Sequence, residues 1–210
     1  MTSQLVKSLY HIIDNPHFNK DCISGGQLSS KEWVIEELNK FEIDLGTVFL
    51  CAGWYGTLAT MLLESDIALT KIRSFDLDDK CYKFADTINR PWVIDGWKFK
   101  ASTLDVHSIT YPLTYTTYRA NGTGVELTEL PDTIINTSCE HIENFNSWYS
   151  KIPTGTIVIL QTNNYFELEE HINCSESLEA FGDQTPMSEV LYEGELPLEK
   201  YIRYMRIGVK

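Results

Sequence analysis

Basic residues are scarce in this 210-residue chain. Its 17 Lys and Arg stand against 30 Asp and Glu, which gives a formal net charge of −13. Because every contact with a phosphate needs a cation, this balance makes nucleic acid an unlikely partner. The densest cationic stretches, near Lys98 and Lys100 and near Arg203 and Arg206, are sparse. We therefore expect a small-molecule or peptide substrate.

Paired cysteines and long apolar runs are also missing. The cysteines at positions 22, 51, 81, 139 and 174 form no C-x-x-C pair, which is typical of reduced thiols. No apolar stretch approaches the roughly 20 residues needed to span a bilayer, and the first five residues lack the basic start of a secretory signal. We expect a cytoplasmic protein without a membrane partner, and the sequence specifies no oligomeric state.

Short apolar runs alternate with helix-like stretches from residue 47 onward. The runs cover residues 47–52, 72–75, 99–102, 133–136 and 156–161, and the helix-like stretches cover 58–64, 79–88 and 143–151. Continuous apolar runs are typical of strands that are buried on both faces of a parallel sheet. The pattern predicts an α/β fold, with a doubly wound, mostly parallel sheet and helices on both faces.

Two helices are predicted before the first strand. Residues 3–14 place their apolar side chains on one helical face, and Gly25-Gly26 then marks a loop. A second helix opens at the candidate caps Ser29 and Ser30 and continues to Phe41. We expect one domain over residues 1–210, in which residues 1–44 form a helical cover and residues 45–210 the core. Whether these helices cover a ligand or only pack on the sheet is open.

Two β segments interrupt the alternation. Residues 113–127 surround Asn121-Gly122, a strong two-residue turn signal, and predict a β-hairpin inserted after the third strand. Residues 188–192 and 201–209 flank a Gly-Glu-Leu-Pro turn and predict an antiparallel pair that closes the sheet.

Glycines and acidic residues follow three successive strands. Gly53 and Gly56 lie between the first strand and its helix, where glycine lets the backbone approach a ligand. Asp76 ends the second strand, where a carboxylate can accept both ribose hydroxyls of a nucleotide. Asp105 follows the third strand, where it could hold an adenine amino group. A tight turn at the glycines and a helix cap at Asp76 are the alternatives.

This order of features resembles the class I S-adenosylmethionine-dependent methyltransferases across about residues 45–209, with INTSCEH after the fourth strand. The resemblance implies S-adenosylmethionine as cofactor. The glycine loop is atypical, because Cys51 stands where the family usually has an acidic residue; the glycine missing at 51 also disfavours NAD. The resemblance places the cofactor against Gly53, Trp54, Tyr55, Gly56, Asp76, Leu77, Asp105, Asn136 and Ser138.

Polar residues after the fourth and fifth strands suggest where the chemistry occurs. Methyl transfer needs an aligned acceptor and often a base, for which His141 and Glu140 are the catalytic candidates; capping of the next helix is the alternative. The long segment after the fifth strand is a candidate substrate-recognition loop, with contacts from Asn163, Asn164, Tyr165 and His171. His171 and Cys174 have metal-ligand spacing, but two ligands make no site, so no metal is predicted.

Three functions follow, in order of preference. The first is an S-adenosylmethionine-dependent methyltransferase that acts on a small-molecule or peptide-borne acceptor. The second is a catalytically silent methyltransferase-like module that binds a nucleotide or a protein, and the third is a Rossmann-fold enzyme that uses NAD or uses adenosylmethionine differently.

Overall fold

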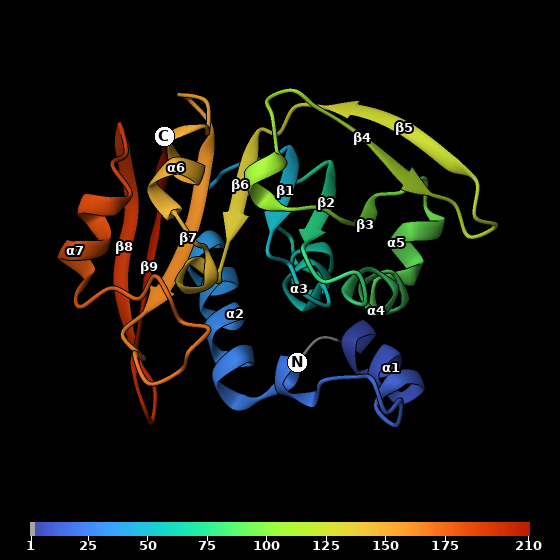
Figure 1. The fold of residues 1–210 in the computed structure, drawn as a ribbon, viewed down its shortest axis with the longest axis horizontal. Coiled ribbons are helices and arrows are strands. Elements are labelled where there is room, and N and C mark those ends of the chain that lie inside the picture. The colour runs from blue at the N-terminus through green and yellow to red at the C-terminus, as the bar shows by residue number, and fades with distance from the viewer. Residues whose placement is uncertain (1–2) are drawn as a thin grey trace.

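Seven strands form one sheet in the order β3-β2-β1-β6-β7-β9-β8 (Figure 1). The computed structural model describes residues 3–210, so the first two residues of the predicted N-terminal cover lie outside it. The strands are β1 Thr47–Cys51, β2 Lys71–Asp76, β3 Phe99–Thr103, β6 Thr133–Asn136, β7 Ile157–Asn163, β8 Glu189–Pro197 and β9 Ile202–Val209.

The sheet is parallel except at its C-terminal edge. β1, β2, β3, β6 and β7 run in one direction, whereas β9 is antiparallel to both β7 and β8. The chain builds outward from β1 in both directions, so β1 and β6 meet where the strand order reverses. Ligands in such sheets bind at the carboxyl ends of the strands, beside this reversal. The predicted α/β class, with its antiparallel C-terminal pair, is confirmed.

Helices cover both faces of the sheet, because apolar side chains of the central strands point toward each face. Val48 and Leu50 pack against α2 Gly25–Leu38, α3 Thr57–Glu64 and α4 Cys81–Ile88. Phe49 and Cys51 face the other side, where α6 Phe145–Ser150 and α7 Leu178–Gln184 lie. The short helix α5 Arg90–Ile94 leads into β3. Burial on both faces explains the continuous apolar stretch Val48–Cys51 in β1.

The N-terminal segment packs beside α3 and α4. Helix α1 Ser3–Ile12 buries Leu5 and Leu9 in a cluster with Cys81 and Ile88, and the 3₁₀ turn η1 Lys20–Ile23 follows it. Figure 1 shows this blue segment running along one side of the molecule before it enters α2.

The predicted start of the second helix is wrong by five or six residues. Helix α2 begins at Gly25, and the Ser24 side chain caps it by accepting a hydrogen bond from the Gln27 backbone N–H at 3.4 Å. Ser29 and Ser30 lie inside the helix. The Gly25-Gly26 pair suggested a loop, but glycine is tolerated in a first turn when a serine precedes it as the cap.

The β-hairpin occurs where it was predicted, although its turn is longer. Strands β4 Leu113–Tyr118 and β5 Gly124–Glu129 pair as a separate two-stranded sheet, joined by residues 119–123 rather than by Asn121-Gly122 alone. The Asn121 side chain accepts from the Thr123 N–H at 3.0 Å and orders this wider turn. Figure 1 shows the hairpin above the β3 end of the sheet.

The predicted Gly-Glu-Leu-Pro turn lies inside a strand. These residues end β8, and the chain reverses over residues 198–201, where the Leu198 N–H donates to the Tyr201 carbonyl at 2.9 Å. A proline at the end of an edge strand loses no ladder hydrogen bond, so the motif is compatible with β structure. Within residues 3–210, no helix has the length and apolar character needed to cross a membrane.

Candidate active site

The turn after β1 has a strained backbone. Ala52, Trp54 and Gly56 have φ angles of +51°, +48° and +67°. A left-handed conformation costs a residue with a Cβ about 1–2 kcal/mol, so two of these positions are unfavourable. Gly53, which the sequence suggested as a point of ligand approach, is required for packing instead, because a Cβ there would overlap the Ser74 hydroxyl on β2.

The rest of this turn is packed into the core. A Cβ at Gly56 would lie 2.8 Å from the Asn89 side-chain nitrogen and 3.1 Å from Phe99. Tyr55 is 5% exposed, and its ring stacks on Phe18 with the centroids 5.1 Å apart. Gly56 and Tyr55 therefore pack on the core side of the turn and support its conformation.

Asp76 ends β2 and holds this turn in place. Its Oδ2 accepts from the Trp54 backbone N–H at 2.8 Å, and its Oδ1 accepts from the Asp78 N–H at 3.0 Å. Burial raises the pKa of Asp76, while the same two hydrogen bonds act in the opposite direction. Because α4 begins only at Cys81, Asp76 is not its N-cap. The carboxylate retains lone pairs for a ligand.

Asp105 lies at the same edge of the sheet, two residues beyond β3. It caps the 3₁₀ turn η2 Val106–Ser108 by accepting from the His107 N–H at 2.8 Å. Leu77, which follows Asp76, is 72% exposed. Asp76 and Asp105 thus lie where the sequence predicted them, at the end of β2 and just beyond β3.

Asn136 ends β6 and is fully buried. Its Oδ1 accepts from the Ser138 N–H at 2.9 Å, which turns the chain toward η3 Cys139–His141. Its Nδ2 has no hydrogen-bond partner among the described residues. Asn136 therefore orders the strand end, while Ser138 is the residue at the surface of the site.

Glu140 is buried in a charged cluster rather than exposed as a helix cap. Its Oε1 accepts from Asn163 Nδ2 at 2.7 Å and from Arg203 Nη2 at 3.1 Å. Glu140 and Arg203 are 2% and 3% exposed. Because Asn163 and Arg203 occupy Oε1 and the side chain is buried, this environment does not favour the predicted role of Glu140 as a base.

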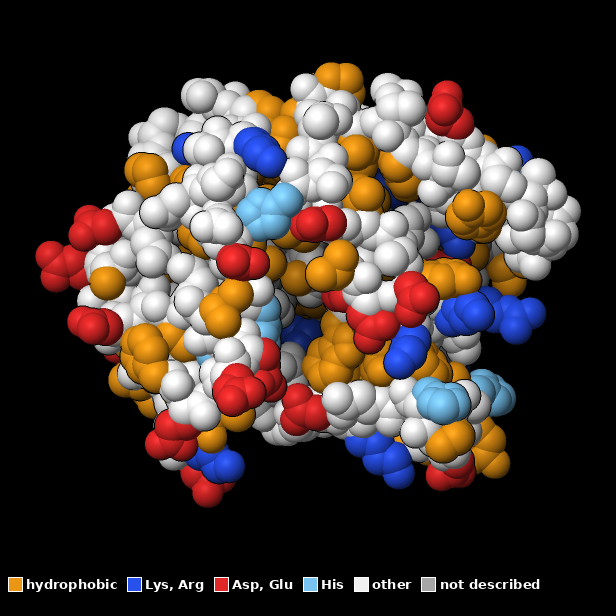
Figure 2. All heavy atoms as spheres, viewed as in Figure 1, with side chains coloured by type: hydrophobic (Ala, Val, Ile, Leu, Met, Phe, Trp, Pro, Cys, Tyr) orange, Lys and Arg blue, Asp and Glu red, His pale blue; other side chains and the backbone are white. Residues whose placement is uncertain are grey.

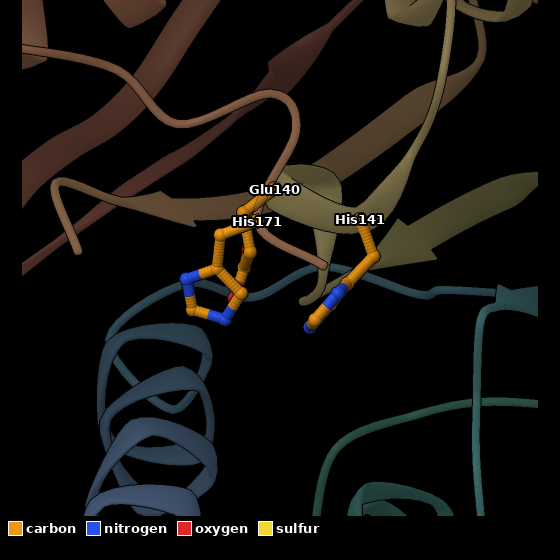
Figure 3. A group of neighbouring side chains, drawn as sticks. All are labelled: Glu140, His141 and His171. Carbon is orange, nitrogen blue, oxygen red and sulfur yellow. The ribbon is translucent and has the colours of Figure 1, made fainter. Parts of the chain in front are cut away.

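His141 and His171 come together from separate loops. Their ring centroids are 4.7 Å apart and their planes are inclined by 83°. His141 Nδ1 lies 2.9 Å from the Glu170 carbonyl oxygen, and His171 Nδ1 lies 2.8 Å from the Tyr165 carbonyl oxygen. Figure 3 shows the two rings projecting in the same direction, with Glu140 behind His171.

The segment after β7 contributes unequally to the site. Tyr165 lies at its surface and stacks on Tyr201 with the centroids 5.4 Å apart. Asn163 is fully buried, and Asn164 accepts from the Ile202 N–H at 2.8 Å, so both asparagines act structurally. Cys174 lies near the Asn163 side chain, with its sulfur 3.4 Å from the Asn163 Oδ1, and does not join His171 in a ligand set.

A cavity of about 1130 Å³ unites these elements. In Figure 2 a hollow near the centre of this face has cationic side chains in its depth and acidic ones around it. Of the residues predicted from sequence, those that line the cavity are Trp54, Asp76, Leu77, Asp105, Ser138, Glu140, His141, Tyr165 and His171. Those outside its lining are Gly53, Tyr55, Gly56, Asn136, Asn163 and Asn164.

Comparison with known proteins gives similarity at the level of the fold. No family model matches the chain, and no curated protein matches it. Magnesium protoporphyrin IX methyltransferase (ChlM) from Synechocystis, with bound S-adenosylhomocysteine, has a TM-score of 0.58 at 14% identity over 99% of this chain and 95% of its own. N-methyltransferase NodS from Bradyrhizobium japonicum, with the same compound, has a TM-score of 0.61 at 9% identity over 98% of each chain.

The fold is that of the class I methyltransferases. Small RNA methyltransferase HEN1 is also similar, with a TM-score of 0.59 at 15% identity, over 91% of this chain but only 27% of that one.

The N-terminal segment forms one wall of the cavity, a role that the sequence left open. Asn19, Asp21 and residues 24–27 line the cavity from the N-terminal side, so this segment covers the site rather than only packing on the sheet. No local pattern marks these residues, because their role depends on how α2 docks.

Two buried cations were also missed as site residues. Arg203 lines the cavity beside Glu140, and Lys31 lies behind it, with Nζ 2.5 Å from the Gln27 Oε1. Burial lowers the pKa of Lys31 to about 7, and the positive charge of Arg203 acts in the same direction. In the sequence these two residues are indistinguishable from ordinary surface cations.

Proposed function

We propose that the cavity binds S-adenosylmethionine and that the chain transfers its methyl group to a small-molecule or peptide-borne acceptor. The observation that carries this proposal is Asp76, a partly buried carboxylate at the end of β2 that borders both the turn after β1 and the cavity. A carboxylate in this position can accept both ribose hydroxyls. The similar structures with bound S-adenosylhomocysteine support the choice of cofactor.

The surroundings of Asp76 fit an adenosine. Asp105 offers an acceptor for the adenine amino group, and Leu77 and Val106 offer apolar surface for the base. Pockets for small ligands usually measure about 300–1,000 Å³, so the 1130 Å³ cavity has room for a donor and an acceptor together. Trp54 and Ser138 also line the cavity.

The acceptor would bind at the other end of the cavity. The cofactor, when bound, supplies a methyl group on a positively charged sulfur, and the residues of the chain must hold an acceptor atom in line with it. His141, His171 and Tyr165 lie together in the cavity wall, and we assign the acceptor to them. His141 remains the predicted proton acceptor, with Glu140 held by Arg203 beneath it.

Charge and thiol content support the proposed setting. The net charge of −13 favours a small or peptide-borne acceptor over a polyanion. All five cysteines are free thiols, and four are buried. Free thiols persist in reducing compartments, so we place the protein in the cytoplasm.

A catalytically silent module is the second candidate, and the turn after β1 favours it. Ala52 and Trp54 carry side chains at left-handed positions, and both side chains line the cavity. Such side chains limit how closely a ligand can approach the backbone. A silent module would bind the nucleoside and show no methyl transfer, whereas the enzyme would do both.

Calorimetric titration with S-adenosylmethionine and S-adenosylhomocysteine tests the proposal. We expect micromolar binding, no preference for NAD, and at least about a tenfold loss with Asp76→Asn, which is equivalent to about 1.4 kcal/mol and to one hydrogen bond to a charged group. The amide oxygen introduced by this substitution would still accept the Trp54 N–H, so the contact that holds the turn after β1 is kept, whereas the bond from the Asp78 N–H is lost. Asp79→Ala, an exposed change in the same segment, is the control. Wild-type protein that binds neither compound would refute the proposal.

A further inference from the structure

Three potential metal ligands meet at the acceptor end of the cavity. Glu140, His141 and His171 each offer one ligand atom, and these atoms lie within 4.8 Å of one another. Two of the residues are adjacent in η3 and the third is 30 positions away, so their spacing along the chain carries no metal signature. Figure 3 shows all three side chains converging from the two loops.

The two imidazoles are already oriented for coordination. Both Nδ1 atoms lie next to backbone carbonyl oxygens, of Glu170 for His141 and of Tyr165 for His171. A carbonyl oxygen only accepts, so each Nδ1 must carry the hydrogen and each Nε2 retains its lone pair. Histidines that bind metals are held by the same type of outer hydrogen bond.

The carboxylate has one oxygen left without a partner. Asn163 and Arg203 hold Glu140 Oε1, whereas Oε2 is buried and has no hydrogen-bond partner among the described residues. An unsatisfied buried acceptor is unfavourable by about 1–3 kcal/mol, and more when it is charged. A cation at this point would satisfy Oε2.

We propose that Glu140, His141 and His171 bind one divalent first-row transition-metal ion. Two nitrogen ligands and one carboxylate oxygen suit zinc, iron, cobalt or manganese better than calcium, which prefers oxygen ligands. Ligand atoms on one such ion lie about 3–3.5 Å apart, given metal distances near 2.1 Å, so small side-chain rotations close the set. His141 is exposed and His171 half-buried, so the remaining coordination positions open into the cavity.

The ion would also define the acceptor, an extension that rests on the proposed function. Three protein ligands leave positions for an oxygen of the acceptor, and coordination lowers the pKa of a bound hydroxyl. The hydroxyl proton leaves to water, the oxygen lone pair forms a bond to the methyl carbon, and the carbon–sulfur electron pair remains on sulfur. The acceptor class is therefore a hydroxyl compound, and on this inference His141 binds the ion in place of the proton-accepting role given to it in the proposed function.

Metal titration tests the site without any methyl donor. Protein freed of metal with EDTA is titrated with Zn²⁺ by calorimetry and with Co²⁺ by visible absorption. We expect one ion per chain, a Co²⁺ spectrum with nitrogen ligands, and more than a hundredfold weaker binding in His141→Ala and His171→Ala. His107→Ala is the matched control, because His107 lines the same cavity but its Nε2 lies 2.8 Å from the Glu143 carbonyl oxygen.

Two results would overturn the site: wild-type protein that binds neither ion, or a His141→Ala/His171→Ala double variant that binds as tightly as wild type. The Co²⁺ spectrum of the wild type needs no variant, so poor folding of a variant cannot obscure the answer. Binding of S-adenosylhomocysteine is measured in parallel. Donor binding without metal binding refutes only this inference, whereas metal binding without donor binding refutes the proposed function.

Discussion

A buried ion pair joins the β4–β5 hairpin to the sheet. Arg73 on β2 contacts Glu129 on β5 through Nε at 2.7 Å and Nη2 at 2.9 Å. The Tyr115 hydroxyl donates to the same carboxylate at 2.9 Å, and Lys71 adds a contact at 2.6 Å. Arg73 and Glu129 are 5% and 9% exposed, so solvent screens their pair only weakly.

Glu129→Ala should lower the free energy of unfolding by about 3–5 kcal/mol, because it leaves Arg73 buried without a counter-ion. Lys71 is more exposed and adds less than about 1 kcal/mol. Burial raises the pKa of Glu129, but Arg73 and Lys71 outweigh it and the net shift is downward. The contribution of the pair is therefore complete above the unfolded pKa near 4.3 and is lost as pH falls through the lower folded pKa.

Urea unfolding at pH 7, followed by tryptophan fluorescence, measures this loss. Glu126→Ala on the exposed face of the same hairpin is the control and should change stability by less than about 0.5 kcal/mol. A Glu129→Ala loss below about 1 kcal/mol, or one equal to the control, would refute the reasoning. So would wild-type protein whose stability relative to Glu129→Ala stayed constant from pH 7 to pH 3.

Three further changes test separate parts of the structure by the same unfolding assay. The pKa of Lys31 falls to about 7 on folding, so above pH 7 the folded state binds fewer protons than the unfolded state. The free energy of unfolding should therefore rise with pH by at most about 1.4 kcal/mol per pH unit. Lys31→Met should remove this rise between pH 7 and 8.5, and an unchanged slope would contradict the assignment. Ser24→Ala should lower the free energy of unfolding by about 1 kcal/mol, because Ser24 caps α2, whereas Ser29→Ala should lower it by less than about 0.5 kcal/mol. Equal losses in the two variants would contradict the assignment of Ser24 as the cap. Gly56→Ala should cost about 2–4 kcal/mol through its left-handed φ and the close approach to Asn89, and a loss below about 1 kcal/mol would show that the turn relaxes freely.

The fold could be predicted because each strand can be recognised from the residues of its own short segment. Strands such as Thr47–Cys51 and Thr133–Asn136 are buried on both faces and therefore appear as continuous apolar runs. The wrong predictions concern glycine and proline, which are typical of turns but also occur at the ends of helices and strands. Gly25-Gly26 occurs in a helix instead of a loop, and Pro197 ends an edge strand instead of a turn.

The candidate site was only partly predictable. Asp76 and Asp105 were located because parallel strands bring their carboxyl ends to one edge. The strained residues Ala52 and Trp54 carry no sequence mark, because left-handed positions are expected at glycine. The approach of Arg203 to Glu140 joins β9 to η3 and depends on the completed sheet.

A crystal structure with S-adenosylhomocysteine tests the central claim most directly. The account predicts ribose hydroxyl oxygens within hydrogen-bond distance of Asp76, adenine beside Asp105, and the sulfur directed toward His141 and His171. Crystals soaked at saturating concentration that show the compound elsewhere, or none in the cavity, would contradict it.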